Sequence, residues 1–381
     1  MIEILFWFSI ILVMASYFLY PLVIYIIAKL LRVGLIVQDI EPPISLIIPM
    51  HNEEKVAKEK VENIFSLDYP KDKLEVIFAL DCCTDRTKEI LLSLNANNME
   101  ILDNMERNGK VAVLNKAVSQ ARGEIIIFSD ANSMHKKDAI RKLIQNFADE
   151  RVGCVAGKLV YTDADTTSVG KGENLYWKYE DFIKRQESRL GRLLVTNGSI
   201  QAVRKEVYPY PDPDVADDFS IPLLIQVKGY KVLYEPKAIV TEIATQSLKE
   251  EFAQKARIIS QGIRGAIRLK KDLAQLNALS MFELIFHKVL RWFVPLLMIV
   301  IFLANIVLMG SRFYLYLFMA QVVFYALALI GFIFRNRSKI KIFYIPFYIC
   351  LVNFASLAAF YRIINRSKTH IWEKAYSTRS L

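Results

Sequence analysis

The sequence predicts an α/β domain held between transmembrane helices at the two ends of the chain. Long uncharged apolar stretches lie near both ends, and between them short β-branched runs alternate with amphipathic stretches. Of the 381 residues, 54% are hydrophobic and 23% are charged. Such a chain is too apolar for an ordinary soluble protein and too charged to lie wholly in lipid, so separate membrane and aqueous parts are expected.

The formal net charge of +10 favours an anionic partner. Several Lys and Arg residues stand beside the apolar stretches, where lipid headgroups are nearer than nucleic acid would be, so we expect membrane lipids as partners and no nucleic acid. The cysteines show no CxxC spacing and two are sequence neighbours; they are Cys82, Cys83, Cys154 and Cys350. This usage suits a reducing compartment and argues against a disulfide framework or a zinc site.

The first helix is predicted within residues 1–32. Residues 4–28 carry no charge, and about 20 apolar residues suffice to cross a bilayer. A cleaved signal peptide is disfavoured, because the stretch is too long, lacks a basic start and precedes no small-residue cleavage site. Pro21 is expected to kink the helix, and Lys29 and Arg32 follow it, so the positive-inside rule places residue 33 onward in the cytoplasm.

Residues 41–246 are expected to form the cytoplasmic domain. The runs 45–49, 74–80 and 124–129 are typical of buried parallel strands, each followed by polar residues and a helix. In such βαβ sheets ligands bind beyond the carboxyl ends of the strands. The functional residues are therefore sought at those ends.

Residues 247–291 predict interfacial amphipathic helices. In 248–273 the apolar residues repeat at helical spacing and the basic residues fall largely elsewhere around the helix. The stretch 281–291 is a second candidate of this kind, leading into the membrane. The alternative for these helices is packing against the core of the soluble domain.

Three more spans are predicted within 292–361, at 292–310, 313–334 and 342–361, which gives four in total. This count places the basic loop near Arg335 inside. It also places the basic tail, 362–381, outside, against the charge rule, so one segment could be re-entrant.

Polar residues gather where the expected strands end. The first strand leads into Pro49, His51, Asn52 and Glu53. Asp81 ends the second strand and is placed to accept hydrogen bonds from a uracil ring or a ribose, whereas Asp85 is interpreted as a helix cap. Asp130 and Asn132 end the third, and their oxygens suit the divalent cation, Mg²⁺ or Mn²⁺, that accompanies a sugar diphosphate.

In this order, and with Gly109 and Lys110 between the second and third groups, these segments resemble the nucleotide-binding half of glycosyltransferase family 2, which has a Rossmann-like GT-A fold. The resemblance covers residues 44 to about 292. The flanking helices are similar to those of membrane-integrated synthases of exopolysaccharide, poly-N-acetylglucosamine, cellulose and hyaluronan. The resemblance to this family implies a nucleotide-sugar site at Pro49, His51, Asn52, Glu53, Asp81, Lys110, Asp130 and Arg257. It also implies metal ligands at Asp130 and Asn132.

The same resemblance implies an acceptor side and a base. Asp218 would be the catalytic base, with Asp217 beside it, although both could instead merely cap the following helix. The acceptor-side residues would be Asn197, Gly198, Ser199, Gln254 and Ile258. Two departures from the family's pattern matter: Asn132 stands where many relatives have Asp, and Ile258 where the Gln-x-x-Arg-Trp signature has an aromatic ring for stacking a sugar.

The resemblance implies an inverting hexosyltransferase. It would move a sugar from a UDP-sugar to a saccharide acceptor at the plasma or inner membrane, with export or accessory proteins as candidate partners. A single addition to a lipid phosphate or a lipid-linked saccharide is the alternative. A non-catalytic nucleotide-sugar sensor or a transport scaffold is a third hypothesis, disfavoured by Asp218 and by the uncharged spans.

Overall fold

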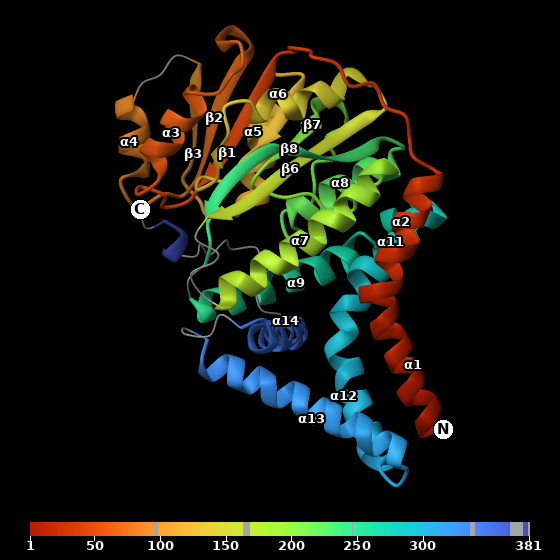
Figure 1. The fold of residues 1–381 in the computed structure, drawn as a ribbon. Helices are drawn as coiled ribbons and strands as arrows, with labels where there is room; N and C mark the ends of the chain where they lie inside the picture. The colour runs from red at the N-terminus through yellow and green to blue at the C-terminus, as the bar shows by residue number, and fades with distance from the viewer. Residues whose placement is uncertain (95–97, 163–167, 246, 336–339, 366–375, 380–381) are drawn as a thin grey trace.

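A computed structural model describes residues 1–94, 98–162, 168–245, 247–335, 340–365 and 376–379. It shows a soluble α/β body above a group of long apolar helices (Figure 1). Most of the predicted basic tail lies outside the described residues. The predicted fold class, an α/β domain with apolar helices at both ends, is confirmed.

The soluble body is built on one sheet of eight strands in the order β3-β2-β1-β4-β7-β6-β8-β5. The three strands predicted from sequence are present, and β1 pairs in parallel with both β2 and β4. The strands are β1 (Ile44–Met50), β2 (Leu74–Asp81), β3 (Met99–Asn104), β4 (Ile125–Phe128), β5 (Met134–His135), β6 (Val152–Thr162), β7 (Gln201–Arg204) and β8 (Lys231–Ile243).

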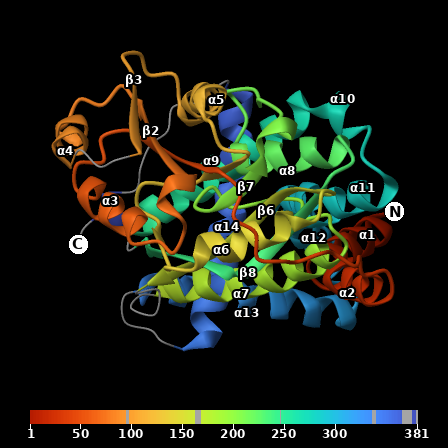
Figure 2. The same cartoon turned by 90° about the horizontal axis from the view of Figure 1, so that it is seen from above.

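Helices cover both faces of the sheet, as Figures 1 and 2 show. In β1, Leu46 and Ile48 pack with α3, α4 and α6 on one face, and Ile47 packs with α5 and α8 on the other. This alternation follows from the two-residue period of a strand. The helices are α3 (Ala57–Phe65), α4 (Thr87–Leu94), α5 (Lys110–Gln120), α6 (Ala139–Ile144) and α8 (Asp217–Val227).

The structure has four helices that are long and apolar enough to cross a membrane: residues 2–30, 278–308, 312–333 and 341–364. The second joins α11 (Ala278–Leu284), a π turn (Ile285–Val289) and α12 (Leu290–Leu308). Residues 281–291 are thus continuous with a span rather than a separate interfacial helix. The last two are α13 (Arg312–Ile333) and α14 (Lys341–Ile364). In Figure 1, α1 and α12 run side by side, whereas α14 is seen end-on and crosses beneath the soluble body.

The first span comprises α1 (Ile2–Met14), a π turn (Ala15–Leu19) and α2 (Tyr20–Leu30). Pro21 has no backbone N–H, so the carbonyl of Tyr17, four residues earlier, lacks its helical partner. The hydroxyl of Tyr179 donates a hydrogen bond to this carbonyl over 2.7 Å. The proline therefore opens a contact between the first span and α7 (Ser168–Arg189) of the soluble body.

Helices α7, α9 (Leu248–Arg268) and α10 (Lys270–Leu273) connect the sheet to the apolar helices. On α9, Ala256 and Ile263 are buried, whereas Ile258 and Ile267 are 46% and 57% exposed. The helix packs against α14 and α8. Lys255 of α9 pairs with Glu173 of α7 at 3.1 Å and with Glu251 at 3.3 Å, which ties the two helices together beneath the sheet.

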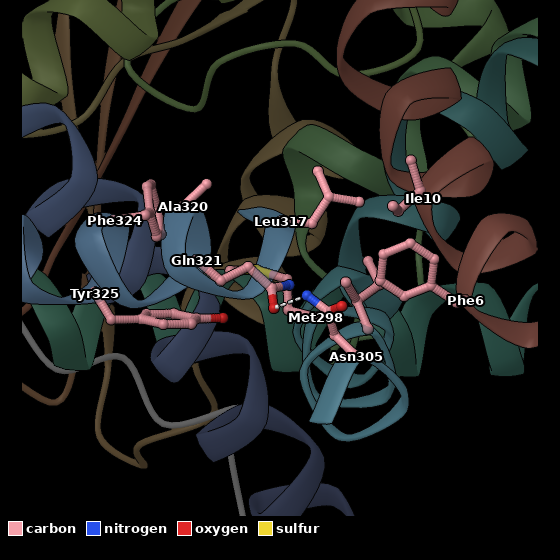
Figure 3. Close-up of a pocket in the computed structure, with 10 residues that line it drawn as sticks. Phe6, Ile10, Met298, Asn305, Leu317, Ala320, Gln321, Phe324 and Tyr325 are labelled. Carbon is pink, nitrogen blue, oxygen red and sulfur yellow. Dashed lines mark hydrogen bonds between the residues drawn. The ribbon is translucent and has the colours of Figure 1, made fainter. Parts of the chain in front are cut away.

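A cavity of about 310 Å³ lies among α1, α12 and α13. Figure 3 shows its mostly apolar walls and one polar contact, in which the side-chain amides of Asn305 and Gln321 lie 3.1 Å apart. Asn305 is fully buried, so pairing with Gln321 offsets the cost of placing an amide among apolar helices.

Candidate active site

A second cavity, of about 330 Å³, begins at the carboxyl ends of the strands and continues down to α9, α12 and α14. The residues predicted from sequence that line it are Lys110, Asp130, Asn197, Gly198, Ser199, Asp217, Asp218, Gln254, Arg257 and Ile258. They come from five separate stretches of the chain, and the fold brings them around one space. The predicted residues that do not line it are Pro49, His51, Asn52, Glu53, Asp81 and Asn132.

Lys110 stands at the centre of the sheet end of this cavity. Its ammonium lies 2.8 Å from Asp130 Oδ1 and 3.4 Å from Asp217 Oδ2. A Cβ atom on Gly198 would come within 2.7 Å of that ammonium, so the glycine leaves the room that Lys110 occupies. Burial opposes the charged form, but Asp130 and Asp217 raise the pKa of Lys110 well above its usual range.

Asp81 holds the loop that carries Lys110. Its carboxylate is buried and accepts hydrogen bonds from the backbone N–H groups of Asn108, at 2.8 Å, and Gly109, at 3.1 Å. Gly109 has φ of 86°, which a residue with a side chain adopts at a cost, and α5 starts with Lys110 directly after it. Asp81 thus positions the helix start, and its predicted contact with a nucleotide stays a prediction.

His51 and Asn52 link the ends of β1 and β2. The His51 ring lies 2.6 Å from the backbone oxygen of Asp81, and the Asn52 side-chain oxygen accepts a hydrogen bond from the Thr84 N–H at 2.7 Å. Asn52 has φ of 56°, a value that asparagine tolerates better than most residues. These contacts fix the two loops that close the sheet end of the site.

Glu53 is paired with a residue that sequence reasoning missed. Arg379, in a short 3-10 turn (Tyr376–Arg379), donates from Nε at 3.0 Å and from Nη2 at 2.9 Å to the two carboxylate oxygens of Glu53. Both side chains are buried, and a two-point Arg–carboxylate contact is among the stronger polar contacts in proteins. Their separation of 326 positions left no local signal.

Asp218 lies where α8 begins, next to the acceptor segment. Pro222, four residues later, cannot donate to the Asp218 carbonyl, which instead accepts from the backbone N–H of Thr196 at 3.0 Å. The proline thereby joins the segment 196–199 to the helix that carries Asp218. Burial and then the neighbouring charge of Asp217 raise the pKa of Asp218 to about 6.

The sheet end of the cavity suits a divalent cation. Lys110 lines the same space as four carboxylates: Asp130, Asp217, Asp218 and Glu242. Burial and then the charge of Asp130 raise the pKa of Glu242. Among the described residues no group of three or more His, Cys, Asp or Glu could hold a metal alone. Asp130 can offer carboxylate oxygens to a divalent cation, but these residues do not form a complete protein site for one.

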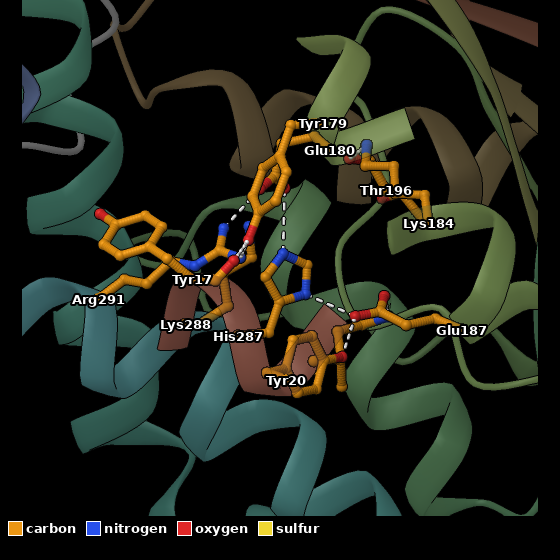
Figure 4. A network of polar contacts seen from close by, with 11 residues as sticks. Tyr17, Tyr20, Tyr179, Glu180, Lys184, Glu187, Thr196, His287, Lys288 and Arg291 are labelled. Carbon is orange, nitrogen blue, oxygen red and sulfur yellow. Dashed lines mark hydrogen bonds and ion pairs between the residues drawn. The ribbon is translucent and has the colours of Figure 1, made fainter. Parts of the chain in front are cut away.

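A second polar network lies at the membrane end of the same cavity (Figure 4). His287 is buried between Glu187, at 2.5 Å, and Glu180, at 3.1 Å. Glu180 also accepts from Arg291 at 2.6 Å, and the hydroxyl of Tyr20 donates to Glu187 at 2.7 Å. The network thus joins three segments: the first span, α7 and the helix that continues into α12.

The sequence analysis selected none of Glu180, Lys184, His287, Lys288 and Arg291. The available signal was the set of ionisable residues near the start of a helix that is otherwise apolar over 278–308. Ionisable groups in such helices usually face a protein interior or a polar cavity. In this protein the ionisable residues of this helix face both the protein interior and the polar cavity.

The soluble body has the GT-A fold of glycosyltransferases, as predicted. The family model described as "Glycosyl transferase family 2" matches residues 45–209. The predicted resemblance to this family is therefore confirmed over residues 45–209. A mannosyltransferase from Pyrobaculum calidifontis, solved in complex with GDP-Man and Mn²⁺, has a similar fold, with a TM-score of 0.69, 22% sequence identity, and coverage of 95% of this chain and 99% of that one.

Among curated proteins, the chain is similar to poly-beta-1,6-N-acetyl-D-glucosamine synthases. The identity is 23% over 254 residues to that of Staphylococcus aureus (strain COL), covering 65% of this chain, and 23% over 253 residues to that of Staphylococcus epidermidis. The chain spans 61% of the length of each of these relatives.

Proposed function

We propose that this protein transfers a sugar from a nucleotide-sugar to a saccharide acceptor at the membrane, with inversion of the sugar's anomeric configuration. The transfer would serve the synthesis of a cell-surface or extracellular polysaccharide. The observation that carries the proposal is the single cavity that joins Lys110, Asp130 and Asp218 to helices α9, α12 and α14. A donor bound at the sheet and an acceptor bound at the membrane would meet at Asp218. The similarity to poly-beta-1,6-N-acetyl-D-glucosamine synthases supports a polysaccharide product.

Asp218 is the proposed base. Its carboxylate would accept the proton of an acceptor hydroxyl while that oxygen attacks the anomeric carbon from the side opposite the diphosphate. The pKa of about 6 suits this role, because a base works best when its pKa is close to the operating pH. Asp217 instead faces Lys110, which supports an orienting or electrostatic role for it.

The leaving diphosphate gathers negative charge, and the proposed residues would offset that charge. Lys110 lies at the sheet end of the cavity and Arg257 on α9, and a guanidinium can grip two phosphate oxygens. A divalent cation held by Asp130 would add further charge stabilisation when bound. Asn132 is half-buried and does not line the cavity, so its role as a second ligand remains a prediction.

We place the soluble domain on the cytoplasmic side, where nucleotide-sugars are available. The support is Lys29 and Arg32 at the end of the first apolar helix. Fusion of a reporter after residue 33, compared with a fusion in the loop between α12 and α13, would test the orientation.

The alternative is a single addition to a lipid-linked acceptor. Ile258 lines the cavity and is 46% exposed, so no aromatic ring is present at that position to stack a growing chain. Both candidates use the same site and differ in the length of the product.

The deciding experiment incubates purified full-length protein in detergent with a panel of UDP-sugars and GDP-sugars. Release of one nucleotide together with a sized saccharide product supports the proposal, and the sizes separate polymer from single addition. Absence of nucleotide release with every donor, in the presence of Mn²⁺ and membrane lipid extract, contradicts it.

A further inference from the structure

The membrane end of the active-site cavity holds a lysine without a charge partner. Lys184 on α7 is 5% exposed and lines the cavity. Its ammonium donates to the Thr196 carbonyl at 3.2 Å and lies 5.4 Å from the centre of the Trp177 ring. Within the part of the chain that the structure describes, no carboxylate forms an ion pair with it. A buried ammonium with one hydrogen bond keeps donor capacity that a ligand can use.

The charged side chains around Lys184 also carry an excess of positive charge. Lys288 and Arg291 line the cavity beside Lys184, and both pair with the same carboxylate, Glu180, at 3.6 Å and 2.6 Å. Lys288 and Arg291 therefore share Glu180, whereas Lys184 has no ion pair among the described residues. Figure 4 shows the three cations on neighbouring elements. Burial and then the charge of Lys288 lower the pKa of Lys184 to about 8, as expected where positive charges crowd.

Two other buried donors nearby have no partner among the described residues. The indole Nε1 of Trp177 and Nε of Arg291 form no hydrogen bond, and both residues line the cavity. Unsatisfied buried donors are costly, and a ligand rich in acceptor oxygens would satisfy them. An excess of positive charge and of N–H donors fits a polyatomic oxyanion.

We propose that Lys184, Lys288 and Arg291 bind a phosphate group carried by the acceptor. The proposal rests on the transfer function proposed above and names the class of acceptor for that site. Trp292 of α12 and Val352 of α14 also line the cavity, so an apolar chain attached to the phosphate would lie between these two helices. Thr196 links Lys184 to the backbone of Asp218, which would place the acceptor's saccharide hydroxyl near the base.

The test measures binding by calorimetry with the purified full-length protein in detergent. The probes are decyl phosphate, decyl glucoside as the uncharged analogue with the same chain, and inorganic phosphate. We expect decyl phosphate to bind at least about tenfold more tightly than decyl glucoside, since one charge-assisted contact is worth that much or more. Tighter binding of decyl phosphate than of inorganic phosphate assigns the subsite to a lipid-linked phosphate, and equal binding assigns it to a soluble sugar phosphate.

Variants on one helix make the test specific. Lys184→Met should weaken decyl phosphate binding about tenfold, and Lys184→Arg, which keeps the charge, should retain most of it. The matched control is Lys178→Met, because Lys178 is exposed on the same helix; it should bind as the unaltered protein does. Unchanged binding by Lys184→Met, or equal affinity for decyl phosphate and decyl glucoside, overturns the proposal.

Nucleotide release measured separately keeps the two proposals distinct. Failure of every donor contradicts the transfer function, whatever the phosphate affinity. Loss of phosphate selectivity with intact nucleotide release contradicts only the phosphate subsite.

Discussion

The two ends of the active-site cavity carry opposite charge. At the sheet end, Lys110 lines the cavity with four carboxylates. At the membrane end, Lys288 and Arg291 share the carboxylate of Glu180, and Lys184 has no ion pair among the described residues. An anionic diphosphate bound at the sheet end would meet like charge unless a cation came with it. An anionic group at the membrane end needs no such help. The contrast explains why we expect a metal requirement for the donor and none for the acceptor.

The largest expected effect concerns Asp218, where the two ends of the active-site cavity meet. Asp218→Asn, nearly equal in volume, should lower turnover about 100- to 10,000-fold, because it removes the base. Nucleotide affinity should survive, since Lys110 and Asp130 make those proposed contacts. Asp217→Asn is the matched control and should cost less.

Transfer assays and nucleotide binding by calorimetry, made on both variants, check this assignment. Near-normal turnover by Asp218→Asn would remove it from the mechanism. Loss of nucleotide binding together with turnover would instead mark a structural role, such as capping α8.

The second prediction concerns the negatively charged sheet end of the cavity. Removing divalent cations with a chelator should suppress transfer on the order of 100-fold, and Mn²⁺ or Mg²⁺ should restore it. Asp130→Asn should weaken the response to the cation, measured as the concentration that gives half-maximal rate. Full activity in excess chelator would show that Lys110 and Arg257 suffice for the diphosphate.

Asn132→Asp sharpens this test, since a carboxylate binds a hard cation more tightly than an amide does. Tighter cation binding in this variant supports Asn132 as a ligand. An unchanged affinity agrees with its position outside the cavity and leaves Asp130 as the protein's ligand.

The third prediction is a pH dependence set by Asp218. Its raised pKa of about 6 means that the carboxyl is mostly protonated below that pH and cannot accept a proton. Turnover should therefore fall about tenfold for each pH unit below 6 and level off above it. The pH profile of kcat with a saturating donor measures this midpoint.

Asp217→Asn should move that midpoint to lower pH, because the negative charge of Asp217 is, after burial, the next cause of the raised pKa. A midpoint that stays at pH 6 in this variant would show that another group sets the profile.

The smallest expected effect concerns product length. Ile258 offers no ring for stacking, so the unaltered protein should make short products or a single addition. Ile258→Trp should lengthen them by a few residues, because a ring stacked on a sugar contributes on the order of 1 kcal/mol. Gel sizing of the products measures this, and long polymer from the unaltered protein would show that stacking there is unnecessary.

The sequence determined the local parts of this protein. Strands 45–49, 74–80 and 124–129 and the apolar helices follow from period and length, which nearby residues set by themselves. The family resemblance placed Lys110 and Asp130 in one nucleotide-sugar site, and they lie 2.8 Å apart. The family motifs then placed Asp217 and Asp218 beside them.

Only the tertiary structure revealed the polar network at the membrane end of the site and the contact between Glu53 and Arg379. Glu180, Glu187 and His287 meet across about 100 positions, and Glu53 and Arg379 across 326. Their pairing depends on how α7, the first span and α12 cross, and crossing geometry comes from packing over whole helix faces. Local patterns set where each helix begins and which face is apolar, but burial by distant segments gives Lys184 its lowered pKa and Asp218 its raised one.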